Sequence, residues 1–211
     1  MVTAGSNVNI KAIEPYADAI LLAWYPGEQG GNALADIIFG NISPAGRLPV
    51  TFYEQLQDLP DYADYAMKNR TYRYFTGKVQ YPFGFGLSYT TFDYTWKKQP
   101  QPIKSANDTL EFSVTVKNTG AVDADEVVQV YIQYPGMERM PVKELKGFSR
   151  VYIKKASNQT IQFRVPAKEL QKWDLYQHTW KLYPGNYTIA IGSSSEDIKL
   201  KSTINIKAGI K

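Results

Sequence analysis

The chain has 211 residues, enough for one large domain or two small ones, and its 44% apolar and 21% charged residues are typical of a globular protein. This composition argues against disorder, collagen and coiled coil. The net charge of +4, from 24 basic and 20 acidic side chains spread along the chain, is too weak for the basic stripe of a nucleic-acid-binding protein. We therefore expect no nucleic-acid partner.

The chain has no cysteine and one histidine, His178, so disulfides, thiolate nucleophiles and histidine-rich metal sites are not expected. We expect no metal and no cofactor, and any catalysis would use carboxylates or tyrosines. No apolar run reaches the roughly 18 residues of a membrane span, and the start lacks a signal-peptide pattern. We expect no membrane contact, and the compartment stays open between periplasmic or secreted and cytoplasmic.

The first hundred residues show the pattern of a parallel α/β unit. Residues 19–25 form a continuous apolar run that predicts a strand buried on both faces, and residues 1–4 contain a piece of another strand. A short helix is expected over 31–39, followed by a turn and an extended segment over 43–52. Residues 53–80 read as a long irregular loop.

This α/β unit is predicted to be incomplete, because one or two parallel strands and one short helix cannot cover both faces of a sheet. Such a unit exposes strand edges and apolar surface. We expect it to be loosely ordered, to self-associate with a neighbouring copy, or to lean on the rest of the chain.

The second half has a different pattern, with apolar and polar residues alternating between turn signals. Seven short strands are expected, over 91–97, 109–118, 126–134, 145–153, 159–165, 185–192 and 197–206. This predicts a seven-stranded antiparallel β-sandwich of the immunoglobulin or fibronectin type III class. The proline-bearing segment 97–102 predicts a boundary between domains 1–100 and 101–211. The first carries 8 basic and 9 acidic side chains, and the second carries 16 and 11.

Four motifs occur in order along nearly the whole chain: AWYPGEQGGNALADIIFG over 23–40 with PAGRLPVTF over 44–52, YPFGFGLSYTTF over 81–92, DEVVQVY over 125–131 and PVKELKGF over 141–148. Together they resemble the C-terminal portion of glycoside hydrolase family 3, the β-glucosidase and β-xylosidase family. The resemblance implies that residues 1–100 are the end of an α/β sandwich domain with a connecting loop, and that 101–211 are a fibronectin type III-like domain.

The resemblance also implies a larger parent enzyme, with a barrel and the rest of the α/β domain upstream, that hydrolyses a β-linked oligosaccharide or aryl glycoside with retention. A retaining glycosidase needs two carboxyl groups about 5–5.5 Å apart. In the family both lie upstream of these motifs, so no catalytic residue is assigned here and this chain alone is expected to be inactive. The alternative is a stand-alone carbohydrate- or protein-binding β-sandwich module.

Four residues are weak candidates for contact with substrate. Glu28 follows the predicted strand at the edge where open α/β sheets bind ligands, although a carboxylate near a helix start is also favoured by the helix dipole. Arg70, Arg73 and Tyr74 belong to a stretch of guanidinium and phenol groups that could bind sugar hydroxyls and faces, or could pack the loop against a neighbouring domain.

Two further aromatic segments have a structural and a functional interpretation. Residues 82–87 are glycine-rich but lack the phosphate-loop pattern, so we expect a turn that docks two domains. Trp173, Tyr176, Trp180 and Tyr183 could form a sugar-binding strip, but aromatic residues at strand spacing more often pack in the core or between domains. His178, among them, is expected to be an exposed or hydrogen-bonded strand residue.

Overall fold

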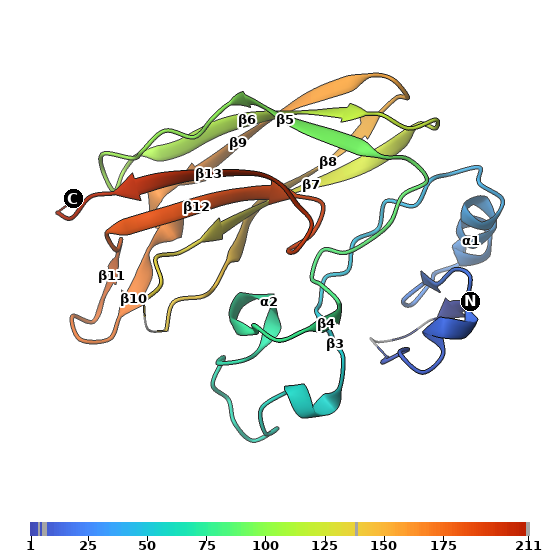
Figure 1. Ribbon diagram of the computed structural model, residues 1–211, viewed down its shortest axis with the longest axis horizontal. Helices are drawn as coiled ribbons and strands as arrows, with labels where there is room; N and C mark the ends of the chain where they lie inside the picture. The colour runs from blue at the N-terminus through green and yellow to red at the C-terminus, as the bar shows by residue number, and fades with distance from the viewer. Residues whose placement is uncertain (4, 6–7, 138, 210–211) are drawn as a thin grey trace.

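The computed structural model describes residues 1–3, 5, 8–137 and 139–209. Figure 1 shows a β-sandwich and, beside it, a smaller unit formed by the first part of the chain. The helices are η1 (Glu14–Tyr16), α1 (Gly30–Ile38), η2 (Leu56–Asp58), α2 (Thr71–Tyr74) and η3 (Ala167–Leu170). The short strands are β1 (Val2–Thr3), β2 (Leu21–Leu22), β3 (Phe52–Tyr53), β4 (Val79–Tyr81), β10 (Lys172–Asp174) and β11 (Thr179–Lys181).

Seven longer strands form the sandwich, as predicted from the alternating pattern. They are β5 (Phe92–Lys98), β6 (Thr109–Asn118), β7 (Ala124–Gln133), β8 (Glu144–Ile153), β9 (Asn158–Pro166), β12 (Gly185–Gly192) and β13 (Ile198–Ile206). One sheet has the order β5-β6-β9 and the other β13-β12-β7-β8, with every pair antiparallel. The predicted fold class, a partial α/β domain followed by this sandwich, is therefore confirmed.

The sandwich is held together by side chains at every second position of its strands. Leu110, Phe112, Val114 and Val116 of β6 are all buried, and they face buried residues of the opposite sheet such as Val128, Val130, Ile132, Tyr187, Ile189 and Ile191. Because successive side chains of a strand point to opposite faces, this period of two fixes the register. Each fully buried side chain of this size contributes about 1.5–3 kcal/mol.

The first strand of the sandwich precedes the predicted domain boundary. Strand β5 pairs with β6 from Phe92↔Asn118 onward, and Trp96 of β5 packs edge-on against Phe112 of the core at 6.1 Å. The division at residue 100 stays a prediction about domains. The sandwich begins at Phe92, because β5 is the strand that pairs with the outer side of β6.

The N-terminal unit contains the expected parallel pair and helix. Val2 lies beside Leu21 and Thr3 beside Leu22, and α1 follows within one residue of the predicted range. The prediction of a strand buried on both faces over 19–25 was wrong, because only Leu21–Leu22 is a strand and its side chains are half-exposed. Burial of a parallel strand requires neighbouring strands and helices on both faces, and among the described residues β2 pairs with β1 alone.

The unit leans on the sandwich, which was one of the three expected behaviours. The turn over 82–87 makes this contact, since Gln129 Nε2 on β7 donates to the Gly84 carbonyl at 3.1 Å and Ser195 N donates to the Phe83 carbonyl at 2.9 Å. The interpretation of 82–87 as a docking turn is confirmed. Gly84 is required at its centre, because its φ is +82° and a Cβ would lie 2.1 Å from Gln129 Oε1.

We expect Gly84→Ala to lower the free energy of unfolding by about 1–3 kcal/mol, because alanine at positive φ is strained and collides with Gln129. Urea unfolding followed by tryptophan fluorescence measures the change. Gly136→Ala is the matched control, since no atom of the described residues lies within 4 Å of the point where its added methyl group would stand. Equal effects of the two substitutions would contradict this account of the turn.

Candidate functional site

Several buried polar contacts lie where the N-terminal unit meets the sandwich. We call this region the contact face and define it by Arg47, Arg73, Phe83 and Gly84 on the N-terminal side and by Glu126, Gln129, Glu144 and Ser195 on the sandwich. It contains two ion-pair clusters, one near the start of β7 and one near the start of β8.

The first cluster is a buried ion pair. Arg47 Nη2 donates to Glu126 Oε2 at 2.9 Å, and only 8% and 2% of the two side chains are exposed. Tyr94 of β5 donates its hydroxyl to Glu126 Oε1 at 2.7 Å. Burial, together with the negative charge of Glu126, raises the pKa of Tyr94. The phenol therefore stays protonated and serves as a hydrogen-bond donor.

The second cluster gathers several donors around one buried carboxylate. Glu144 accepts hydrogen bonds from Arg73 of α2, from Lys172 of β10 and from the Tyr134 hydroxyl at 2.6 Å, and Lys146 Nζ lies 3.2 Å from Glu144 Oε2. Burial alone would raise the pKa of Glu144, but the hydrogen bonds and nearby cations outweigh it and hold the pKa at about 2. The carboxylate is therefore ionised throughout the physiological range.

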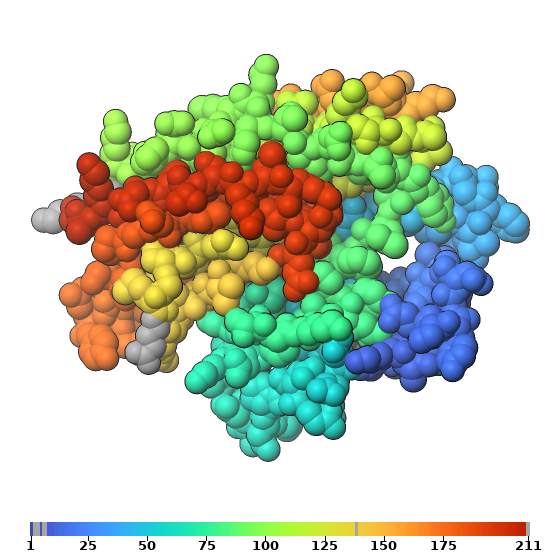
Figure 2. Space-filling view, viewed as in Figure 1, coloured from blue at the N-terminus to red at the C-terminus, as the bar shows by residue number. Residues whose placement is uncertain are grey.

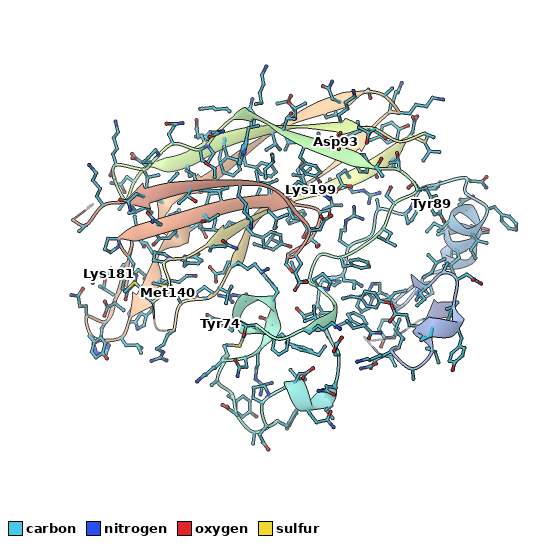
Figure 3. The ribbon with its side chains drawn as sticks, viewed as in Figure 1. Tyr74, Tyr89, Asp93, Met140, Lys181 and Lys199 are labelled. Atoms are coloured by element: carbon cyan, nitrogen blue, oxygen red, sulfur yellow. The ribbon has the colours of Figure 1, made fainter. Side chains whose placement is uncertain are left out.

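The contact face positions the segment that carries three of the predicted substrate contacts. Arg73 is engaged with Glu144 and lies over the Tyr74 ring, 5.5 Å from its centroid. Arg70 instead donates to the carbonyls of Asp61 at 2.9 Å, Asp64 at 2.6 Å and Ala66 at 3.2 Å, so it shapes the irregular loop. Figure 3 places Tyr74 on α2, between the sandwich and that loop.

Backbone strain marks the same segment. Thr71 has a φ of +55°, where β-branched residues are rare, and its amide donates to the Tyr53 hydroxyl at 2.6 Å. The next amide, of Tyr72, donates to Thr51 Oγ1 at 3.1 Å, and the Tyr72 hydroxyl accepts from Leu145 N at 3.1 Å. Contacts from both sides therefore hold α2 in one position against the sandwich.

The fourth candidate, Glu28, lies apart from the others. It is exposed in the turn between β2 and α1, and within the described part of the chain it has no hydrogen bond or ion pair. The structure brings Arg73 and Tyr74 together, leaves Arg70 in the adjoining loop and keeps Glu28 in the N-terminal unit. A role in substrate binding stays a prediction for all four.

An apolar hollow of about 600 Å³ opens in the N-terminal unit. Glu14 stands at its edge and accepts from the Tyr81 hydroxyl at 2.5 Å, a bond that lowers the pKa of Glu14. Burial, followed by that same bond, raises the pKa of Tyr81 to about 12. The larger apolar residues of its lining are Val8, Ile10, Ile20, Leu21, Leu22, Trp24, Ile37, Leu48, Phe52, Phe85 and Leu87. Self-association through this exposed surface stays a prediction.

Neither a metal centre nor a membrane span is found in the part of the chain that the structure describes. No three acidic or histidine side chains there are grouped to hold an ion, and no helix there is long and apolar enough to cross a bilayer. The arrangement is suited to positioning: two carboxylates of the sandwich hold two arginines of the N-terminal unit.

Sequence reasoning did not single out Arg47, Glu126, Glu144 or Glu14. The first three lie inside the motifs PAGRLPVTF, DEVVQVY and PVKELKGF. The signal that could have identified them is a charged residue within a largely apolar stretch. Such a charge is costly to bury unless it has a partner of opposite charge, so its position indicates a buried ion pair.

Two family models match parts of this chain. Residues 1–89 match the glycosyl hydrolase family 3 C-terminal domain, and residues 126–195 match a fibronectin type III-like domain. The first model is matched by the α/β unit and the second by the docked sandwich, so both parts of the chain correspond to the C-terminal region of family 3 glycoside hydrolases. The chain belongs to glycoside hydrolase family 3.

Individual relatives are similar over almost all of this chain. A xylan 1,4-β-xylosidase of Xylanibacter ruminicola is 42% identical over 94% of the chain, which covers 23% of that protein. A periplasmic β-glucosidase of Salmonella typhimurium is 36% identical over 87% of this chain, and the match covers 26% of that protein. The crystal structure of a family 3 β-glucosidase from Bifidobacterium adolescentis superimposes with a TM-score of 0.89, at 34% identity over 97% of this chain and 32% of that one. The chain thus spans about a quarter of the length of its sequence relatives.

We expect Glu126→Gln to lower the free energy of unfolding by about 3–5 kcal/mol, because it leaves the Arg47 guanidinium buried without a counter-charge. Asp125→Asn is the matched control at the neighbouring position, where Asp125 pairs with Arg150 in an exposed setting and should contribute at most about 1 kcal/mol. Thermal and urea unfolding measure both. A loss below 1 kcal/mol for Glu126→Gln would contradict a buried pair.

The Glu144 cluster predicts a loss of stability in acid. A carboxyl whose pKa is lowered by folding, here from 4.5 to about 2, stabilises the fold above the higher value and loses that contribution as the pH falls toward the lower one. The stability gap between the wild type and Glu144→Gln should therefore shrink by about 3 kcal/mol between pH 5 and pH 2. Urea unfolding at each pH measures the gap, and a gap independent of pH would refute the assignment.

Proposed function

We propose that this chain acts as the C-terminal region of a retaining exo-β-glycosidase of the β-glucosidase or β-xylosidase type, in which it supports the catalytic domains. One observation carries the proposal: family motifs from both halves of the chain meet at the contact face, where Arg47 and Glu126 form a buried ion pair. Two units joined by desolvated charges have one favoured relative placement, because any other leaves a charge unpaired.

The chemistry of retention explains why the chain needs the rest of an enzyme. One carboxylate attacks the anomeric carbon while a second carboxylic acid, about 5–5.5 Å away, protonates the leaving oxygen. We propose that both groups are supplied by upstream domains, a barrel and the remainder of the α/β unit. The apolar hollow beside β2 is the surface those domains would cover, since parallel strands are stable when both faces are packed.

A chimera tests the proposal. The C-terminal quarter of the Xylanibacter ruminicola relative is replaced by this chain, and hydrolysis of an aryl β-xyloside is compared with that by the relative lacking its C-terminal quarter. We expect the chimera to keep activity and the shortened relative to lose most of it, since the catalytic domains lose their support. The chain alone should show no turnover.

A second chimera carries Glu126→Gln and should lose activity in parallel with stability, whereas one carrying Asp125→Asn should not. Turnover by the chain alone would refute the assignment of the catalytic pair to upstream domains. An inactive but folded chimera would refute the proposed supporting role.

A further inference from the structure

The hairpin formed by β10 and β11 presents large aromatic side chains to solvent. Trp173 is 46% exposed, Trp180 62% and Tyr176, in the turn between the strands, 96%. Their exposure contradicts packing in the core, while packing between domains stays a prediction. His178 is exposed, as expected, but lies in the same turn rather than in a strand. Exposed aromatic groups that cluster in this way are typical of binding surfaces.

The turn of the hairpin is organised around a buried carboxylate. Asp174 Oδ1 accepts from the amides of Tyr176 at 2.9 Å and Gln177 at 3.0 Å. Its other oxygen accepts from the Tyr183 hydroxyl at 3.0 Å and from Lys181 Nζ at 3.4 Å. A recognition surface held in one conformation before binding loses less conformational entropy when the ligand arrives.

The two indoles form a defined pair. Trp173 and Trp180 are directly opposite on the two strands, with ring centroids 5.8 Å apart and planes at 74°. Rings that meet edge to face do not cover each other as stacked rings would, so indole surface stays free for a ligand. Because neighbouring side chains of a strand point to opposite faces, the two indoles share one face of the hairpin, and Lys181 and Asp174 lie on the other.

The hairpin lies far from the surface that upstream domains are proposed to cover. Figure 1 shows β10 and β11 at one end of the long axis of the molecule and α1 with the N-terminus at the other. In the space-filling view the hairpin, coloured orange, forms an outer lobe on the side opposite the blue N-terminal unit (Figure 2). The hollow beside β2 is therefore a separate surface from the hairpin.

We infer that the β10–β11 hairpin is a carbohydrate-binding site that takes the sugar rings of a β-1,4-linked xylo- or gluco-oligosaccharide. Equatorial hydroxyls leave the two faces of these rings apolar, and such a face fits flat against an indole while the hydroxyls at its edge meet polar side chains. The choice of ligand rests on the proposed function, because a β-glycosidase that also holds its oligosaccharide outside the active site raises its local concentration.

Titration of the full chain with xylohexaose and cellohexaose, followed by tryptophan fluorescence and calorimetry, tests the site. We expect saturable binding that Trp180→Ala and Trp173→Ala weaken by about tenfold or more, as removal of a central aromatic contact does. Trp180→Tyr should recover part of the affinity. Phe39→Ala, which removes an exposed ring at the other end of the molecule, is the matched control and should bind as the wild type. A β-1,4-galacto-oligosaccharide, in which the axial C4 oxygen carries the glycosidic bond and bends the chain away from a flat ribbon, should bind more weakly.

Absence of saturable binding to either oligosaccharide, or equal binding by the wild type and both tryptophan variants, would overturn the inference. If the chain binds oligosaccharide but binding through the hairpin tryptophans is lost in the chimera, the hairpin packs on upstream domains. That result also overturns the inference. Because oligosaccharide binding by the chain is measured separately from hydrolysis by the chimera, the two proposals can fail separately. If the chimera is active but the chain does not bind oligosaccharide, only the binding site is refuted. If the chain binds oligosaccharide but the chimera is inactive, only the supporting role is refuted.

Discussion

The placement of the two units depends on a single buried ion pair, Arg47 with Glu126. Both side chains are almost fully buried, so each charge requires the other, and the Tyr94 hydroxyl donates to the second oxygen of the carboxylate. This requirement brings the segment before β3 onto the start of β7. The glycine turn at Gly84 then fits against Gln129, and α2 reaches Glu144.

The polarity of the contact face is opposite to the net charge of the two halves. The first hundred residues carry a slight excess of acidic side chains and the remainder an excess of basic ones, yet both arginines come from the first half and both carboxylates from the second. Net charge would draw the halves together in many orientations. The desolvated pairs select one of them, because a misplaced arginine or glutamate would be buried without a counter-charge.

The sandwich could be predicted well from the sequence and the contact face could not. A period of two, as in Leu110, Phe112 and Val114, is a local property that one strand displays by itself. Arg47 and Glu126 are 79 positions apart, and Arg73 and Glu144 are 71 apart, so their pairing appears only when the chain is folded. The prediction of a buried strand over 19–25 was wrong for a related reason. Burial of a strand depends on neighbouring strands and helices, and the local sequence pattern does not show whether they are present. The two hairpin tryptophans are exposed where packing in the core was one of the two expectations, because large aromatic residues are usually buried; packing against another domain stays a prediction.

The two ion-pair clusters differ in how they would tolerate separation of the units. Glu144 has Lys172, Lys146 and Tyr134 of the sandwich beside it and stays compensated when Arg73 leaves, whereas Glu126 has, among the described residues, only the Tyr94 hydroxyl besides Arg47. The cost of separating the two units is therefore unequal along the contact face. It is greatest at Arg47, whose loss leaves Glu126 buried without a counter-charge, and smaller at Arg73, where the sandwich supplies Glu144 with cations of its own.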